Sequence, residues 1–241
     1  MTFLRVLGSL VLALPMTMFA QSDVTYTSAQ DGNFAVNYAS NLERGDGVVN
    51  VTNTGASAGT RVPLVGRNSY GDICVNAYVY APDQELAACC TCKVTPNSLH
   101  SWPVYFGSNS LLANQRNQNI LDALRGGLNG NLSVVIKLYA TVASGISGND
   151  PNSSTCPNPG NVVSTIGRAT TGMVAWATHS HPTNTTAVAI TETPFVNSTL
   201  STGEYGKLIA DCNNLQGGGS TRLCPGCQYG GLDASLNTAV Q

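Results

Sequence analysis

Cysteines are the residues of this sequence whose type and spacing could do chemistry. There are eight of them: Cys74, Cys89, Cys90, Cys92, Cys156, Cys212, Cys224 and Cys227. Three chemistries are open to them, namely structural disulfides, thiolate metal ligation and thiol redox exchange. An even number in an exported chain favours structural disulfides, up to four, because compartments outside the cytosol are oxidising. All eight are therefore disulfide candidates.

The first group of cysteines lies near an expected hairpin. Cys89 and Cys90 are neighbours and would point to opposite faces of a strand, whereas Cys90 and Cys92 would share one face. A four-residue turn, or one longer or shorter by a single residue, brings Cys74 close to this group on the opposing strand. Opposing positions have the Cβ separation that a disulfide needs. We predict that Cys74 pairs with Cys90 or Cys92.

The second group lies near the C-terminus. Cys212 falls on an expected helix, and Cys224 and Cys227 follow in a sparse tail. A bond from Cys212 to Cys224 or Cys227 would pin this tail to the helix and stabilise it by up to about 3 kcal/mol in the chain-entropy model. Cys156 has no partner that the sequence identifies.

Metal and redox chemistry are the alternatives for the cysteines. A redox CxxC normally opens a helix, and the Gln-Tyr-Gly-Gly that follows Cys224-Pro225-Gly226-Cys227 is a poor helix start. A zinc site would combine this segment with Cys90 and Cys92, or with His179 and His181, which would share a strand face. Because a proline follows the two histidines at once, they fit a polar strand end better.

Other motifs for catalysis lack their structural context. Gly55-Ala56-Ser57-Ala58-Gly59 matches the nucleophile elbow in letters, but β-branched residues and a proline follow where that motif needs a helix. Asp83 and Glu85 flank an expected turn and are more simply solvated. Trp102 and Trp176 could line a sugar-binding face, although packing explains single tryptophans more often. We assign no catalytic, cofactor-binding or metal residue, and no cofactor.

Short β-branched or alternating segments separated by turn residues predict a mostly β chain. The expected strands are 24–27, 34–38, 48–53, 62–65, 73–80, 85–92, 104–106, 132–142, 172–179 and 187–191, and the expected helices are 115–125 and 202–215. Ser201 offers an N-cap hydroxyl at the start of the second helix. The segment 47–55 resembles the opening strands of bacterial immunoglobulin-like modules, with Val49 and Val51 inward and Asn50 and Thr52 outward. The predicted fold is an immunoglobulin-like or related β-sandwich with a C-terminal helix and a cysteine-rich tail.

The N-terminus has the features of a secretory signal. Arg5 precedes an apolar run that is too short for a spanning helix, and Ala20 ends a plausible cleavage site. We predict a signal peptide at 1–20, a β-sandwich-like domain at 21–200, and a helix with a disulfide-pinned tail at 201–241. The mature chain has no other stretch apolar enough to span a bilayer, so a secreted, periplasmic or extracellular location is expected.

Charge excludes one class of partner. Charged residues make up 10% of the chain, the formal net charge is −2, and no basic run occurs. A protein that holds a phosphate backbone needs clustered lysine and arginine. Nucleic acid is therefore not an expected partner.

Two stretches resemble a group of exported, cysteine-containing bacterial proteins with no assigned activity. One holds Asp72-Ile73-Cys74-Val75-Asn76-Ala77-Tyr78-Val79-Tyr80 and Cys89-Cys90-Thr91-Cys92. The other holds Leu200-Ser201-Thr202-Gly203-Glu204 followed by Cys212, Cys224 and Cys227. The resemblance implies export and a shared cysteine framework, and it implies no chemistry.

Three classes of function stay open. A non-enzymatic structural, adhesive or assembly module is favoured because no site motif survives, and strand addition at an open sheet edge is one route to self-assembly or to a cell-surface partner. A secreted hydrolase or carbohydrate-binding protein is the first alternative, since site residues can be scattered over loops. A thiol or zinc protein is the second.

Overall fold

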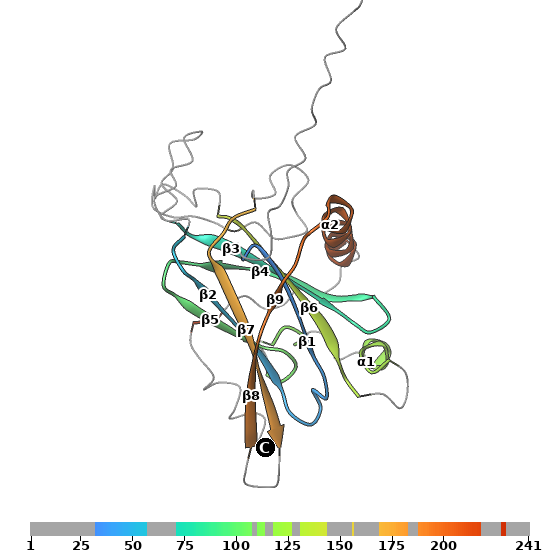
Figure 1. The fold of residues 1–241 in the computed structure, drawn as a ribbon. Helices are drawn as coiled ribbons and strands as arrows, with labels where there is room; N and C mark the ends of the chain where they lie inside the picture. Colours follow the sequence, from blue (N-terminus) through green and yellow to red (C-terminus); the bar gives the residue numbers. More distant parts are fainter. Residues whose placement is uncertain are drawn as a thin grey trace, which may run out of the picture.

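Two antiparallel sheets face each other in the computed structural model of the chain (Figure 1). The structure describes residues 32–56, 71–107, 110–113, 118–126, 131–143, 156, 169–182, 188–217 and 228–229. Sheet A has the strand order β4-β3-β6-β1-β9, and sheet B has the order β10-β5-β2-β7-β8. The strands are β1 (Phe34–Ala39), β2 (Gly47–Asn53), β3 (Ile73–Tyr80), β4 (Leu86–Val94), β5 (Leu99–Pro103), β6 (Val134–Val142), β7 (Met173–Pro182), β8 (Val188–Pro194), β9 (Val196–Asn197) and β10 (Gln228–Tyr229).

The core lies between the two sheets. Val49 and Val51 of β2 and Ile73 and Val75 of β3 are fully buried and belong to one apolar cluster. The alternation along β2 places Asn50 on the outer face of sheet B, so the predicted inward and outward positions of this strand are confirmed. The mostly β sandwich with a C-terminal helix is confirmed as well.

Helix α2 (Thr202–Gly217) covers the outer face of sheet A as a third layer (Figure 1). Tyr78, Tyr80 and Leu208 form a second buried cluster under this helix. Strand β3 is therefore buried on both faces, which explains why its sequence is apolar almost throughout. The helix begins where the Ser201 hydroxyl accepts a hydrogen bond from the N–H of Glu204 at 3.1 Å, so the predicted N-cap is confirmed.

Polar groups fix α2 on sheet A at one side of this cluster. The Tyr80 hydroxyl donates to Asp211 Oδ2 at 3.0 Å, Lys207 forms an ion pair with Asp211, and Lys137 forms one with Glu204. The ammonium of Lys137 lies 4.8 Å from the centroid of the Tyr80 ring. Burial, followed by the charge of Asp211, raises the pKa of Tyr80. The hydroxyl therefore stays protonated and remains a donor.

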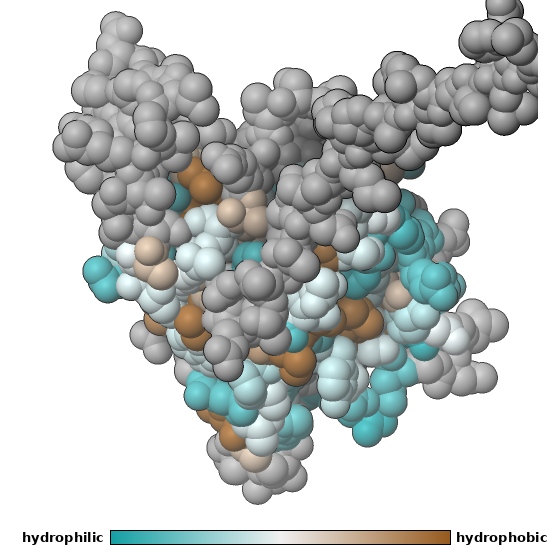
Figure 2. All heavy atoms as spheres, turned by 45° about the horizontal axis from the view of Figure 1, so that its top comes forward, coloured by the Kyte–Doolittle hydropathy of each residue, from teal (hydrophilic) through white to brown (hydrophobic). Residues whose placement is uncertain are grey.

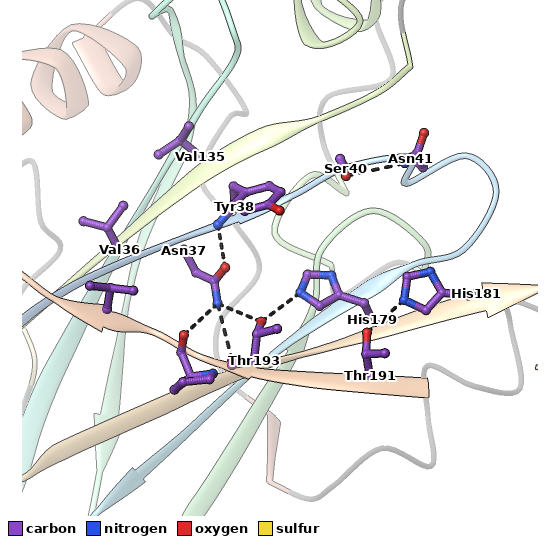
Figure 3. A pocket seen from close by; sticks show the side chains of 12 residues that line it. Val36, Asn37, Tyr38, Ser40, Asn41, Val135, His179, His181, Thr191 and Thr193 are labelled. Atoms are coloured by element: carbon purple, nitrogen blue, oxygen red, sulfur yellow. Dashed lines mark hydrogen bonds between the residues drawn. The ribbon is translucent and has the colours of Figure 1, made fainter. Parts of the chain in front are cut away.

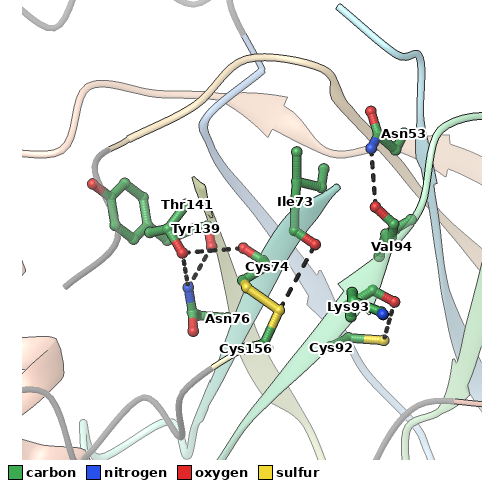
Figure 4. The surroundings of a disulfide bond; sticks show 10 residues. All are labelled: Asn53, Ile73, Cys74, Asn76, Cys92, Lys93, Val94, Tyr139, Thr141 and Cys156. Carbon is green, nitrogen blue, oxygen red and sulfur yellow. Dashed lines mark hydrogen bonds between the residues drawn. A yellow bond between two sulfur atoms is a disulfide. The ribbon is translucent and has the colours of Figure 1, made fainter. Parts of the chain in front are cut away.

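Cys74 pairs with Cys156, so the prediction that it pairs with Cys90 or Cys92 is wrong (Figure 4). The register shifts near the turn between β3 and β4, and Cys74 lies opposite Lys93. Cys74 also lies on the outer face of sheet A, whereas Cys90 and Cys92 are part of the core between the sheets. The shift is a local irregularity of the β4 backbone that no turn residue signals.

Cys212 pairs with Cys89, so the prediction of a bond to Cys224 or Cys227 is wrong. Helix α2 packs on β4, and the outward side chain of Cys89 lies in the same buried cluster as Cys212. Cys90 lies in the core on the other side of the sheet, so the predicted opposite directions of Cys89 and Cys90 are confirmed. This bond ties the helix to the sheet and not to the tail.

Cys90 and Cys92 are also disulfide-bonded. They share one face of β4, as predicted, and Cys92 Sγ lies 3.6 Å from His100 Nδ1 on β5. A disulfide sulfur is not a thiolate, so the zinc site that would use Cys90 and Cys92 is excluded. Cys224 and Cys227 lie outside the described residues, although β10 begins directly after Cys227 and pairs with β5.

Most predicted elements are present with shifted ends. Strands β1, β2, β3, β4, β6, β7 and β8 and both helices, α1 (Gln118–Leu124) and α2, match predicted segments. The predicted strand 104–106 is wrong because this segment is a series of bends, and the strand β5 before it was not predicted. Strands β9 and β10 were not predicted either. The predicted strands 24–27 and 62–65 lie outside the described residues, as do the predicted signal peptide at 1–20 and most of the predicted tail.

The disulfides indicate an oxidising compartment, because cytosolic thiols are kept reduced. Among the helices of the described residues, none has the length and apolar character needed to cross a membrane.

Candidate functional site

A groove of about 630 Å³ runs between β1 and the hairpin of β7 and β8 (Figure 3). Strand β1 with the ends of β6 and β9 forms one wall, and the inner face of the hairpin forms the other. The lining consists of Val36, Asn37, Tyr38, Ser40, Asn41, Val135, His179, His181, Thr191, Thr193, Pro194 and Val196.

The sequence of β7 explains where the groove begins. The side chains of Ala175 and Ala177 face the other sheet and are buried in the core. The next inward positions are His179 and His181, which line the groove instead. The strand therefore changes from small apolar to polar side chains along one face. The predicted shared face of the two histidines is confirmed.

The two imidazoles face hydroxyl groups of β8. His179 Nε2 lies 3.2 Å from the Thr193 hydroxyl oxygen, and His181 Nε2 lies 2.8 Å from that of Thr191. The rings are stacked, with centroids 6.5 Å apart and an interplanar angle of 29°. Burial, and then the charge of His181, lowers the pKa of His179. His179 is therefore neutral at pH 7, with one nitrogen that donates and one that accepts.

The opposite wall carries apolar side chains. The Tyr38 side chain is 67% exposed and the neighbouring Val196 is 68% exposed. In the register of sheet A, Tyr38 lies opposite Val135, and Val36 lies opposite Val196. By strand alternation these four side chains lie on the outer face of sheet A, opposite to the side chain of Asn37, and form an aromatic and aliphatic surface at the rim of the groove.

Asn37 joins the two walls. Its amide nitrogen donates to the Thr193 hydroxyl at 3.3 Å and to the Pro194 carbonyl at 3.4 Å. Its side-chain oxygen accepts the N–H of Tyr38 at 2.7 Å (Figure 3). These bonds hold Tyr38 at a fixed distance from the hairpin, so the groove is formed without a ligand.

Among the described residues, the groove lining contains no aspartate, glutamate, lysine or arginine. Glu192 of β8 points to the opposite face of sheet B, where its Oε1 lies 3.4 Å from the Thr178 hydroxyl. Glycoside hydrolysis needs two carboxyl groups, and the described lining supplies none. The groove can therefore offer neutral hydrogen bonds and an aromatic contact. On the face drawn in Figure 2, apolar side chains form separate small areas among polar ones.

The other residues considered from the sequence lie elsewhere. Trp102 is fully buried between the sheets, and Trp176 is half-buried on the outer face of sheet B. Asp83 Oδ1 accepts the N–H of Glu85 at 3.1 Å, so both are turn residues as predicted. The serine of the elbow-like segment, Ser57, lies outside the described residues.

Asp46 is a buried ionisable group that sequence reasoning missed. Its carboxylate accepts N–H groups from Gly47 at 2.8 Å, Tyr105 at 2.9 Å and Phe106 at 3.0 Å. Burial raises the pKa of Asp46 to about 7, although these hydrogen bonds act in the opposite direction. Because backbone groups occupy both oxygens, Asp46 fixes the bends after β5 rather than acting on a ligand. The turn sequence around Asp46, with glycine on both sides, was the available signal.

Comparison with protein-family models, with curated proteins and with solved structures found no match.

Proposed function

We propose that the protein is an exported, non-enzymatic adhesive module that binds a neutral carbohydrate in the groove between β1 and the β7–β8 hairpin. The observation that carries the proposal is the lining, which joins an exposed tyrosine ring to amide, hydroxyl and imidazole groups without a charged side chain among its described residues. A sugar has an apolar C–H face and a rim of hydroxyls that both donate and accept. Tyr38 suits the face, and Asn37, His179 and His181 suit the rim.

Size and charge support the same ligand class. The volume of about 630 Å³ lies in the range of small-ligand sites. A charged ligand would lose its hydration in the groove without gaining a countercharge, which costs free energy. The absence of carboxylates from the described lining favours binding over hydrolysis. Export rests on the disulfides and on the predicted signal peptide.

The strength of the Tyr38 contact can be estimated. A fully covered aromatic side chain buries on the order of 200 Å², and 67% of Tyr38 is exposed. A sugar that covers half of the open surface buries about 65 Å² of it, which contributes about 1.6 kcal/mol at about 25 cal/mol per Å². Removal of the ring should therefore weaken binding roughly 15-fold.

A panel of neutral glycans, followed by calorimetry on the mature chain, tests the proposal. Tyr38→Ala is expected to weaken the best glycan about 15-fold, whereas Tyr38→Phe keeps most of the affinity. Val174→Ala is the matched control, because Val174 is 47% exposed on the outer face of sheet B and outside the groove. No binding to any neutral glycan, or unchanged affinity in Tyr38→Ala, would refute the proposal.

Assembly through β8 is the second candidate function. Strand β8 lies at the edge of sheet B, and Ile190 on it is 45% exposed. An edge strand offers unpaired backbone groups to another strand. The N–H of Ile190 faces the free edge of the sheet, whereas the N–H of Thr191 pairs with β7. Ile190→Pro therefore removes a donor from the free edge and leaves the pairing with β7 intact. Equal mass in light scattering for the wild type and Ile190→Pro argues against assembly at this edge.

A further inference from the structure

We propose that His179 and His181 form an open binding site for a divalent transition metal, with copper bound most tightly. The inference goes beyond carbohydrate binding and does not depend on it. Its basis is the placement of two imidazoles at alternate positions of one strand, on the face that lines a solvent-connected groove. The stacked arrangement directs both Nε2 atoms toward the same neighbouring strand.

The donor chemistry selects the metal. Imidazole nitrogen suits copper, nickel and zinc, whereas calcium and magnesium prefer carboxylate and carbonyl oxygen. The groove holds no carboxylate among its described residues, so the hard cations have no anionic ligand there. For a given nitrogen site, affinity rises from cobalt through nickel to copper and falls again at zinc. A copper preference is therefore the expected signature.

The second strand supplies oxygen atoms near both nitrogens. The Thr191 hydroxyl lies 2.8 Å from His181 Nε2, and the Thr193 hydroxyl lies 3.2 Å from His179 Nε2. A metal held by the imidazoles would displace these hydrogen bonds, and the hydroxyls or water would then complete its coordination. The two rings must approach each other, since their centroids are 6.5 Å apart. Both side chains have room to rotate, because His181 is exposed and His179 is half-exposed.

The site differs from a structural zinc centre. Within the described ranges, no group of three or more His, Cys, Asp or Glu side chains is placed to hold a metal. Two protein ligands leave several positions to water or to another ligand, as in an open site. The sequence has three histidines, and the third, His100, is buried beside Cys92. Imidazole ligation at the surface therefore depends on His179 and His181 alone.

The test uses the mature chain without a histidine tag. Calorimetric titration with copper, nickel and zinc chloride is expected to give one equivalent of copper, bound more tightly than nickel or zinc. Electron paramagnetic resonance should show nitrogen coupling to the bound copper. His179→Ala and His181→Ala should each weaken copper at least tenfold, and circular dichroism should show that both remain folded. Tyr38→Ala should bind copper as the wild type does, which separates this site from the carbohydrate proposal.

Two results would overturn the inference. One is copper affinity in the His179→Ala/His181→Ala double variant equal to that of the wild type. The other is bound copper without nitrogen coupling. Neither result depends on glycan binding, so a variant that loses its glycan still tests the copper site.

Discussion

The bond between Cys89 and Cys212 makes a quantitative prediction about stability. It joins residues 123 apart in sequence, so it restricts the unfolded chain strongly. The chain-entropy relation gives about 5 kcal/mol for a loop of this size at 25 °C. Cys90 and Cys92 are also disulfide-bonded, and their expected bonds to Cys224 and Cys227 shorten the effective loop to roughly 15 residues, which lowers the expected loss to about 3 kcal/mol. The Cys89→Ala/Cys212→Ala variant should lose this amount of unfolding free energy.

Urea unfolding measures the loss with two probes. Fluorescence of Trp102, which is fully buried between the sheets, reports on the sandwich. Far-ultraviolet circular dichroism at 222 nm reports on the helices, mainly α2. The Cys74→Ala/Cys156→Ala variant is the control: the intact Cys89–Cys212 bond leaves it an effective loop of roughly 70 residues, which predicts a loss of about 4.4 kcal/mol without touching the contact between helix and sheet.

The two double variants should differ in the order of events. Without the Cys89–Cys212 bond, α2 is held on sheet A only by its side-chain contacts, so the dichroism signal should change at lower urea than the fluorescence. In the control both signals should change together. A loss below about 1 kcal/mol in the Cys89→Ala/Cys212→Ala variant would show that the entropic argument fails for this bond.

Local structure gives three further predictions. Asp46 keeps a proton in the native state up to about pH 7, whereas it loses the proton near pH 4 when unfolded. The free energy of unfolding should therefore fall as pH rises between these values, and Asp46→Asn should lose this component; a component that rises with pH contradicts it. Ser201→Ala should cost about 1 kcal/mol in thermal unfolding while Ser201→Asn costs little, and equal losses would argue against the cap. Peptide mapping should link Cys90 and Cys92 to Cys224 and Cys227, because these are the remaining cysteines of the chain. A bond between Cys90 and Cys92 themselves would contradict this prediction.

Local patterns were sufficient for much of the fold. The alternation around Val49 and the apolar run of β3 follow from which faces are buried, and these are properties of short segments. The cap at Ser201 is likewise a local signal. The faces of Cys89 and Cys90 follow from the two-residue period of a strand. Each of these predictions is confirmed.

The disulfide partners could not be derived in the same way. The register between β3 and β4 depends on a shift near their turn, which moved Cys74 opposite Lys93. The partner of Cys212 depends on where α2 packs on the sheet. That position is determined by the buried cluster that contains Tyr78 of β3 and Leu208 of α2. Contacts between distant segments cannot be inferred from local sequence, and for this reason both pairings were predicted incorrectly.

The groove itself was not predicted, and only the shared face of two of its histidines was. The shared face of His179 and His181 follows from the strand period, but their neighbour Tyr38 lies on a strand far away in the sequence. The two strands even belong to different sheets. Asn37, which bonds to Thr193, is the residue that brings the walls together, and nothing in its local sequence marks this role.

A nuclear magnetic resonance titration can show whether a neutral carbohydrate binds in the groove. The mature chain labelled with ¹⁵N is titrated with the best neutral glycan from the panel. We expect amide shifts in the groove, at residues 36–41, 179–181 and 191–196, with α2 unchanged. Shifts that gather on α2 or on the outer face of sheet B, with the groove amides unmoved, would contradict it.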